Sequence, residues 1–430
     1  MISKSKEHNP NYLAKLVKIK EIKDHPNADR LKLTVINFAD VIIGDDIKTG
    51  DMMVYFPLES QINVEFLKDS NQFSSELLNK DSTKKGYFDK NGRVRAVKLR
   101  GVGSNGILMP LKTVEDFFGK LDAEENEEFD TINDVLCCKK YQIPVKEGLG
   151  VKVGKKPKET RLIDGQVKLH VDTERLDKNL HQLNYEDYIS ITYKLHGTSW
   201  WCANVPVKRR LNIIEKLLRK IGIKINDVEY DHVYGSRKVV KNSYADKKCN
   251  DFYDGDLWSK IKNELADKIP KGFTLYGECV GYTDLMAYIQ SNYDYGCDAF
   301  NKQKIFVYRI TFTNNDGISY ELSTEQIMDF CYRFGLNYVP VLYYGKISDY
   351  ISNMEMSGDD SWRREFYEQL KKDFTEKDCF MCKNKVPEEW IVIRKEDLFS
   401  FKAFKLKSFR FYELETEMLD KWILDIESEN

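Results

Sequence analysis

The sequence contains no long hydrophobic run and no strong excess of charge of either sign. We find no apolar segment near the roughly 18 residues that a membrane span requires, and no signal peptide at the start. The 67 Lys and Arg residues are balanced by 69 Asp and Glu residues, so the formal net charge is -2. Because there is no global basic field, affinity for nucleic acid would have to come from local clusters of basic residues.

Cysteines are few and irregularly spaced. Nine cysteines in 430 residues do not form a disulfide framework. Cys379 and Cys382 make one CxxC, but no second pair at zinc-like spacing follows, which favours reduced thiols over a structural zinc site. We therefore expect a soluble, intracellular protein in a reducing setting, without an indication of its compartment.

The length and the strand pattern predict two domains. Residues 12–60 read as short strands with β-branched alternation, which suits a small closed antiparallel barrel, and HPNADRLKLT resembles the first hairpin of OB-fold modules. A Gly-Lys-Pro linker lies at 154–158. We predict an α+β protein with an OB-type β-barrel over 1–155. A larger nucleotidyltransferase domain, ATP-grasp-like, with antiparallel sheets and helices, would follow over 156–430.

Two basic segments could contact nucleic acid. Asn91-Gly92 is a strong hairpin signal, and the strand after it places basic residues on one face. The members of this face are Arg93, Arg95, Lys98 and Arg100. An RNA-binding platform and a solvated outer face are both consistent with it. Residues 205–224 predict an amphipathic helix with a basic outer face, either packed on the domain or used for phosphate or partner contact. The acidic stretch 115–134 reads as an exposed helix or insertion.

The segment ISITYKLHGTSWW at 189–201 places a lysine at the end of a strand. β-branched residues run into Lys194, and a turn with Gly197 follows. A lysine partly buried in such a place can lose its proton more easily, and a neutral amine can attack the α-phosphorus of a nucleotide to form a phosphoramidate. The glycine and the hydroxyls of Thr198 and Ser199 allow close approach of ribose and phosphate. KxxG alone is a weak motif, and a plain surface lysine is the alternative.

Three later segments supply carboxylates and lysines. FTLYGECVGY is an apolar strand that carries Glu278, and EEWIVIRKED places Glu389 just before the strand WIVI. FKAFKLKSFRFYE presents Lys405 and Lys407 two residues apart, therefore on one face of a strand. Glutamates can orient a divalent cation or its waters, while lysines neutralise charge on the α-phosphate and the leaving pyrophosphate. Each glutamate alone could instead be a buried carboxylate paired to Arg or Lys.

These elements follow the order of the motifs of covalent nucleotidyltransferases, the superfamily of DNA ligases, RNA ligases and mRNA capping enzymes. The matching elements are Lys194-Leu195-His196-Gly197, Gly235-Ser236-Arg237, Tyr276-Gly277-Glu278, Ile305-Phe306-Val307-Tyr308, Glu389 with WIVIR, and Lys405-Leu406-Lys407. YKLHGTS, the SRK element and the basic helix resemble ATP-dependent RNA ligases. DNA ligases and capping enzymes typically place their OB domain after the catalytic domain, so an amino-terminal barrel resembles the RNA ligase subgroup with that order. The likeness covers nearly the whole chain.

The resemblance implies a role for each matching residue. Lys194 would form the lysyl-AMP intermediate, in a nucleotide site that includes Tyr193, Leu195 and Gly197. His196 would pack beside the lysine. Ser236 and Arg237 would contact the nucleotide and later the RNA terminus, and Glu278 would contact the ribose or metal waters. Phe306 or Tyr308 would contact the adenine. Lys405 and Lys407 would bind the α-phosphate, and Arg175 would bind the β or γ phosphate.

The fourth motif departs from the family pattern, which usually has glycine after its glutamate. Trp390 stands there in this sequence, and the register is open by one residue because Glu388 and Glu389 are adjacent. We favour Glu389 as the metal residue, because the apolar strand then leads to Arg394 in the usual position. Glu388 and Glu278 are further candidates.

The resemblance implies an ATP-dependent RNA ligase that joins 3'-OH and 5'-phosphate ends, at nicks or broken ends of RNA, through lysyl-AMP and RNA-adenylate. ATP and Mg²⁺ or Mn²⁺ would be the cofactors, and a monomer is expected. A DNA ligase or capping guanylyltransferase on the same core, and a non-catalytic RNA-binding protein, are the alternatives.

Overall fold

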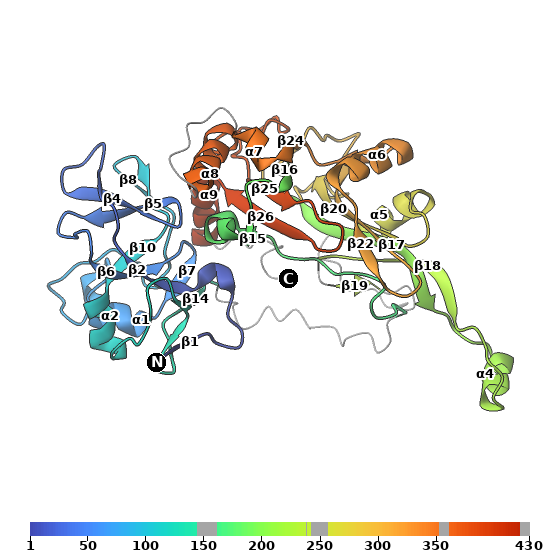
Figure 1. Cartoon of the computed structure of the whole chain (residues 1–430), viewed down its shortest axis with the longest axis horizontal. Helices are drawn as coiled ribbons and strands as arrows, with labels where there is room; N and C mark the ends of the chain where they lie inside the picture. Colours follow the sequence, from blue (N-terminus) through green and yellow to red (C-terminus); the bar gives the residue numbers. More distant parts are fainter. Residues whose placement is uncertain (144–160, 238, 242–256, 352–360, 422–430) are drawn as a thin grey trace. The chain divides into compact units, whose positions relative to one another are not determined.

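The structure is a computed structural model that describes residues 1–143, 161–237, 239–241, 257–351 and 361–421 (Figure 1). The described residues form two compact units, one of 1–143 with 407–421 and the other of the remaining residues from 161 to 406. The predicted boundary near residue 155 and its linker lie outside the described residues, so this division stays a prediction. The eight cysteines in the described ranges are free thiols, and none of the described helices is long and apolar enough to cross a membrane.

The first unit is built from five small sheets of short strands. Their strand orders are β1-β12-β13, β10-β6-β2-β11, β14-β7, β3-β4-β5 and β8-β9. The strands are β1 (Ile2–Ser3), β2 (Ala14–Lys18), β3 (Lys23–Asp24), β4 (Leu31–Ile36), β5 (Ala39–Gly44), β6 (Met52–Phe56), β7 (Ser60–Ile62), β8 (Lys98–Leu99), β9 (Val102–Gly103), β10 (Ile107–Pro110), β11 (Glu128–Phe129), β12 (Thr131–Ile132), β13 (Val135–Leu136) and β14 (Cys138–Lys140). The expected closed barrel is wrong for the described residues, because many of these strands are too short to continue a ladder around a barrel.

Three helices complete this unit: α1 (Val64–Asp69), α2 (Leu111–Phe118) and α9 (Phe409–Asp420). The expectation of an exposed helix or insertion over 115–134 holds for most of its acidic side chains, which are exposed, but not for its apolar ones. Helix α2 buries Val114 and Phe118 in the core of the unit, and the acidic residues after it lead into strands β11 and β12.

The predicted basic strand face is wrong in its geometry. Only Lys98 of the four basic residues lies in a strand, β8. Arg93 is 1% exposed and donates to the Thr416 carbonyl and, at 2.8 Å, to Asp420 of α9. Arg95 pairs with Asp89 and Asp420, and Lys98 pairs with Glu413 of α9. These three side chains hold α9. Among the described contacts, Arg100 is the member of the predicted face that has no ion pair with α9.

Glu59 is buried against the same helix, and this predicts a pH dependence of stability. Its Oε1 accepts from Thr416 Oγ1 at 3.0 Å, and its Oε2 lies 4.0 Å from Arg93 Nη1. Burial raises the pKa of Glu59 to about 7, against the attraction of Arg93. Because the pKa of Glu59 is higher in the folded than in the unfolded protein, its protonated form stabilises the fold. This stabilisation is complete below the pKa of the unfolded state and is lost as the pH rises through the pKa of the folded state.

Glu59→Gln is therefore expected to remove this pH dependence. From about pH 5.5 to about pH 8.5, the wild-type free energy of unfolding should fall by about 2 kcal/mol relative to Glu59→Gln. Chemical denaturation of both proteins at the two pH values measures the difference. Parallel pH profiles would show that Glu59 ionises normally in the folded protein.

The second unit contains two sheets. Their strand orders are β15-β26-β25-β16-β24 and β19-β18-β17-β20-β21-β22, with β23 also paired to β21. The strands are β15 (Glu174–Arg175), β16 (Tyr188–Lys194), β17 (Thr198–Lys208), β18 (Val228–Gly235), β19 (Val240–Lys241), β20 (Phe273–Gly281), β21 (Gln303–Thr313), β22 (Ser319–Glu321), β23 (Asn337–Tyr338), β24 (Val341–Lys346), β25 (Trp390–Lys395) and β26 (Lys402–Lys407). The helices are α3 (Leu176–Asn179), α4 (Ile213–Lys220), α5 (Leu257–Leu265), α6 (Thr324–Phe334), α7 (Ile347–Tyr350) and α8 (Ser361–Phe374).

The seven-stranded sheet has one face covered by helices. Residues of α5 and α6 share a core with Leu275, Cys279 and Ile310 of the central strands. Side chains alternate between the faces of a strand, so Glu278 lies on the other face. Its cross-strand partners Ser199 and Phe306 share that face. The face without helices is therefore where the predicted site residues of this sheet gather.

The predicted amphipathic helix over 205–224 is shorter than expected. Residues 205–208 continue strand β17, and α4 begins at Ile213 after a capping box between Asn212 and Glu215. None of its residues is buried, and Ile213 and Leu217 are 77% and 57% exposed. Helix α4 lies at the tip of the β17–β18 hairpin (Figure 1), which argues against the alternative in which its apolar side packs on the domain.

Candidate active site

Lys194 ends the strand β16, which lies inside the five-stranded sheet between β25 and the edge strand β24. β16 pairs with β25 on one side and β24 on the other, which fixes the backbone up to the Lys194–Trp390 pair. Lys194 Nζ lies 3.6 Å from Glu278 Oε1 and 3.3 Å from Glu389 Oε2, and it donates to the Leu195 carbonyl at 2.7 Å. A carboxylate of strand β20 and one from the segment just before β25 thus meet at one amine.

Glu278 is held by the turn that follows the lysine. Its carboxylate accepts from the Gly197 N–H and from Ser199 Oγ, each at 3.2 Å, and the residue is 2% exposed. The β17–β20 register, in which Ser199 faces Glu278, brings these donors into place. A buried carboxylate with two donors and a nearby amine has a fixed orientation.

Gly197→Ala is expected to disrupt this arrangement. A Cβ at residue 197 would lie 2.3 Å from the Cys279 carbonyl oxygen and 2.9 Å from Glu278 Cγ. Because backbone atoms cannot move aside easily, we expect a loss of about 1–3 kcal/mol in the free energy of unfolding. Nucleotide-dependent labelling of the protein should slow by roughly tenfold or more, since the displaced backbone moves its N–H away from Glu278.

The control is Gly335→Asn at the end of α6, where an added Cβ meets nothing within 4 Å and the backbone is left-handed. Labelling of this variant should match that of the wild type. Normal labelling by Gly197→Ala would contradict the packing argument.

Glu389, and not Glu388, lies at the lysine. Glu389 Oε2 also lies 3.6 Å from His196 Nδ1, and the His196 ring packs edge-on against Tyr293. Glu388 points elsewhere: its Oε1 accepts from the Lys377 N–H at 3.4 Å, and burial raises its pKa to about 7. The two adjacent carboxylates therefore have different partners, the Lys377 N–H for Glu388 and the Lys194 amine for Glu389.

Trp390 stands where the family usually has glycine, and its contacts in the structure explain the larger side chain. Its ring lies 5.5 Å from Lys194 Nζ and 5.3 Å from Lys405 Nζ. An aromatic face attracts ammonium groups, so this ring supports two of the predicted site lysines.

Lys405 and Lys407 have different surroundings. Lys405 lies opposite Arg175 in the parallel β15–β26 pair. Lys407 forms an ion pair with Glu415 of α9 and belongs to the first compact unit. The Arg175 guanidinium holds both oxygens of Asp177, at 2.9 and 2.6 Å. The structure therefore groups Lys405 with Lys194 through Trp390, and it shows Lys407 and Arg175 engaged with acidic partners.

Phe306 and Tyr308 reach the helix-free face of the seven-stranded sheet by a β-bulge. The register with β20 shifts between Tyr276 and Gly277, so Tyr308 has no partner in that register. Tyr308 packs against the cluster that contains Trp201 and Tyr276. Tyr193 and Leu195 are buried, and the Tyr193 ring packs on Phe380.

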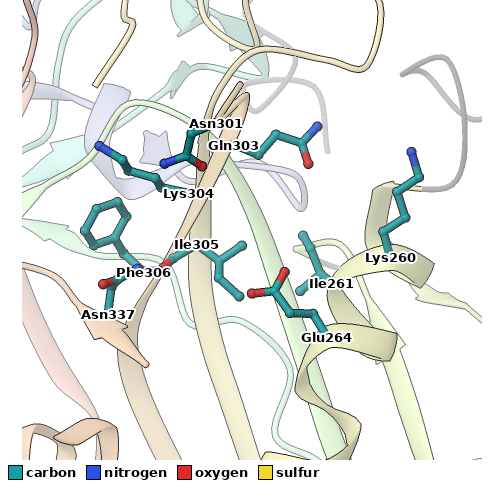
Figure 2. Close-up of a pocket in the computed structure, with 9 residues that line it drawn as sticks. All are labelled: Lys260, Ile261, Glu264, Asn301, Gln303, Lys304, Ile305, Phe306 and Asn337. Atoms are coloured by element: carbon teal, nitrogen blue, oxygen red, sulfur yellow. Dashed lines mark hydrogen bonds between the residues drawn. The ribbon is translucent and has the colours of Figure 1, made fainter. Parts of the chain in front are cut away.

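A pocket at the start of β21 is lined by side chains from both faces of this strand. It has a volume of about 470 Å³ and is lined by Lys260, Ile261, Glu264, Asn301, Gln303, Lys304, Ile305, Phe306 and Asn337. Figure 2 shows Ile305 pointing toward Ile261 and Glu264 of α5, with Phe306 on the other side of the strand. Lys194, Glu278 and Glu389 do not line it, so this pocket is not the lysine site.

Arg237 brings in two residues that the sequence did not single out. Arg237 forms an ion pair with Asp172, and His170 Nε2 lies 3.5 Å from the same carboxylate. The Tyr308 hydroxyl lies 3.4 Å from His170 Nδ1. Ser236 contributes its carbonyl, which accepts from Trp201 Nε1 at 2.8 Å. The alternation of His170 and Asp172 was visible in HVDTERLDKN, but their partners lie far along the chain.

The residues present fit a divalent cation that is shared with phosphates. Glu278 and Glu389 offer carboxylate oxygens around one point, and Mg²⁺ or Mn²⁺ commonly takes one or two carboxylates plus waters and phosphate oxygens. Within the described ranges, no cluster of three or more His, Cys, Asp or Glu side chains could hold a metal by itself. A cation here would therefore depend on a bound nucleotide.

Comparison with known proteins agrees with this fold. An apo mutant of an RNA ligase from Naegleria gruberi has a TM-score of 0.57 at 16% identity, covering 94% of this chain and 98% of that one. A mutant of a Naegleria gruberi RNA ligase with ATP and Mn has a TM-score of 0.54 at 16% identity, with 95% and 99% covered. Another mutant, with AMP and Mn, has a TM-score of 0.55 at 16% identity, with 94% and 98% covered. No curated protein matches the chain.

Family models match both parts of the chain. A model described as an OB-fold domain matches residues 13–111, which confirms the expected amino-terminal OB fold. A model described as RNA ligase matches residues 187–409, just over half of the chain, and this range contains Lys194, Glu278 and Glu389. The chain therefore belongs to the RNA ligase family, with an OB-fold domain at its amino terminus.

Proposed function

We propose that this protein is an ATP-dependent RNA ligase that joins 3'-OH and 5'-phosphate ends through lysyl-AMP and RNA-adenylate intermediates. One observation carries the proposal: Lys194 Nζ lies between Glu278, in β20 of the seven-stranded sheet, and Glu389, directly before β25 of the five-stranded sheet. RNA is the proposed partner, at nicks or broken ends, and a monomer is the proposed working unit.

In the first step, Lys194 Nζ attacks the α-phosphorus of ATP. The N–P bond forms, the bond to the bridging oxygen breaks, and pyrophosphate leaves with the electron pair. The amine has to lose a proton, and Glu389 Oε2 at 3.3 Å is the carboxylate within closest reach to accept it. The hydrogen bond from Lys194 Nζ to the Leu195 carbonyl supports a fixed direction of attack.

The residues around the lysine supply the other requirements of this step. Phe306 offers a stacking surface for adenine on the same face as Glu278. Glu278 is oriented to accept from the ribose, and Lys405 can bind the α-phosphate from the neighbouring strand. The Naegleria ligase structures with ATP and Mn or AMP and Mn support ATP and a divalent cation as cofactors. When bound, the cation would neutralise charge on the phosphates.

Two transfers complete the joining reaction. The 5'-phosphate of RNA attacks the lysyl-AMP phosphorus, which breaks the N–P bond and returns the lysine. The 3'-hydroxyl then attacks the 5'-phosphorus of the RNA-adenylate, AMP leaves and a phosphodiester forms. Positioning and electrostatics are the contributions of the protein, as in other phosphoryl transfers.

Incubation with α-labelled ATP and Mg²⁺ or Mn²⁺ tests the proposal. We expect a labelled protein band that unlabelled ATP suppresses and unlabelled GTP does not. Transfer of the label to 5'-phosphorylated RNA, and sealing of nicked duplexes with RNA at the 3'-hydroxyl side, should follow. Preference for GTP would indicate a capping enzyme, sealing of DNA nicks alone a DNA ligase, and RNA binding without a labelled band a non-catalytic protein.

A further inference from the structure

A segment near the start of the second predicted domain lies on the helix-free face of the seven-stranded sheet. Leu162 pairs with Val207 of β17, and Leu162 and Val167 pack against the cluster that contains Trp201. The Tyr276 hydroxyl of β20 donates to the Lys168 carbonyl. This strap, residues 161–172, is therefore anchored at several points before it reaches His170 and Asp172.

The bulge in β21 aims two side chains at the end of the strap. Tyr276 pairs with Arg309 and Gly277 pairs with Val307, so Tyr308 is the extra residue of the bulge. The Arg309 guanidinium lies 4.6 Å from the Tyr276 ring and is held by Glu321. Tyr308, the other residue of the bulge, places its hydroxyl 3.4 Å from His170 Nδ1.

His170 connects Tyr308 to the acidic partner of Arg237. Its two ring nitrogens face different groups, with Nδ1 toward the Tyr308 hydroxyl and Nε2 3.5 Å from Asp172 Oδ1. A neutral imidazole with its proton on Nε2 satisfies both, accepting from the tyrosine and donating to the carboxylate. Burial, followed by the charge of Arg237, lowers the pKa of His170 to about 3, so the ring is neutral at working pH.

The chain of contacts ends at Arg237 near the rim of the site. Side-chain exposure is 57% at Asp172 and 25% at Arg237, against 2% at Glu278 and 5% at Glu389. The more exposed Arg237 is therefore easier for a polynucleotide end to reach than the buried carboxylates. A planar guanidinium that a carboxylate holds in one orientation matches the geometry of a phosphate better than one that rotates freely.

We propose that His170 and Asp172 are positioning residues that hold Arg237 for the 5'-phosphate of the RNA end. The proposal rests on the proposed ligase function and on the contact of Arg237 with the RNA terminus that the family resemblance implies. Tyr308 fixes the His170 ring, His170 fixes the Asp172 carboxylate, and Asp172 fixes the guanidinium of Arg237. The ordered side chain then binds the phosphate without first losing its rotamer freedom.

Separation of the reaction steps tests this inference. Wild-type protein and the variants His170→Ala, His170→Gln and Asp172→Asn are first loaded with α-labelled ATP. The isolated labelled proteins are then mixed with increasing 5'-phosphorylated RNA, and single-turnover transfer of the label is measured. His181→Ala and Asp316→Asn are the matched controls, because both residues are exposed and lie outside the site.

We expect lysyl-AMP formation within about threefold of wild type in all variants. The RNA concentration for half-maximal transfer should rise roughly tenfold or more in His170→Ala and Asp172→Asn, since small misplacements of a binding group have effects of this size. His170→Gln should recover part of the loss, because an amide can also accept from Tyr308 and donate to Asp172. Both controls should match the wild type.

Three results would overturn the inference. They are an unchanged RNA dependence in His170→Ala and Asp172→Asn, an equal loss in lysyl-AMP formation and in transfer, and no recovery by His170→Gln in a folded protein. Thermal melting identifies any variant that fails to fold, and the remaining variants then decide. Absence of lysyl-AMP in the wild type would instead overturn the proposed ligase function itself.

Discussion

Lys194→Ala and Lys194→Arg are expected to lose RNA joining to below detection. No other amine in the described site lies between both carboxylates, and arginine stays protonated and cannot act as a nucleophile. Removal of a nucleophile costs several orders of magnitude, roughly 10³-fold or more, even when the rest of a site is intact. Joining of 5'-phosphorylated RNA with ATP measures the loss.

A preformed RNA-adenylate separates lost chemistry from lost folding. Lys194 acts as a nucleophile only in the first step, so Lys194→Ala should still join RNA that already carries AMP on its 5'-phosphate. Lys402→Ala is the matched control, because Lys402 lies exposed in the same sheet and should keep full joining with ATP. Joining with ATP by Lys194→Ala would contradict the assignment of the nucleophile.

Glu389→Gln is expected to reduce lysyl-AMP formation by roughly 10²- to 10³-fold, and Glu388→Gln by no more than a few-fold. Glu389 Oε2 lies 3.3 Å from Lys194 Nζ, whereas the Glu388 carboxylate accepts from the Lys377 N–H. Glutamine keeps the size of each side chain but cannot accept the lysine proton or neutralise a cation. The initial rate of protein labelling with α-labelled ATP gives both values.

The pair of variants also tests the register of the fourth motif. A large loss in Glu388→Gln with near-normal labelling in Glu389→Gln would assign the motif to the other glutamate. Thermal melting is the control for folding, since both residues are 4% exposed and each substitution lies in a buried place. A loss in both variants without loss of folding would mean that the two carboxylates act together.

The cluster around the lysine could be predicted because each member is tied to a local signal. Lys194 ends a strand before a glycine turn, and Glu278 interrupts an apolar strand. The adjacent pair Glu388 and Glu389 could not be resolved by pattern alone. Which of the two carboxylates meets Lys194 depends on the β16–β25 register. That register joins segments 195 residues apart in the sequence.

The basic face of the first unit shows what a local pattern misses. Arg93, Arg95 and Lys98 look like a solvated or RNA-binding stripe, but each pairs with an acidic residue of α9. The partner helix begins at Phe409, more than 300 residues later. Alternation along one segment cannot reveal a helix that covers it, so long-range packing decided the outcome.

His170 and Asp172 were missed for the same reason. Each is an ordinary polar residue in its own segment, and its partners Tyr308 and Arg237 come from β21 and the end of β18. The bulge that aims Tyr308 depends on Gly277, where a Cβ would lie 2.3 Å from the Phe306 carbonyl oxygen. The glycine was visible in the YGE motif, but the bulge was not.

Mapping the adenylylated residue in the wild-type protein tests the central claim most directly. The protein is incubated with ATP and Mg²⁺ or Mn²⁺, digested under conditions that preserve a phosphoramidate, and analysed by mass spectrometry. We predict one AMP adduct, on the peptide that contains Lys194, which is lost when 5'-phosphorylated RNA is added. An adduct on another residue, or no adduct while RNA is still joined with ATP, would contradict the account.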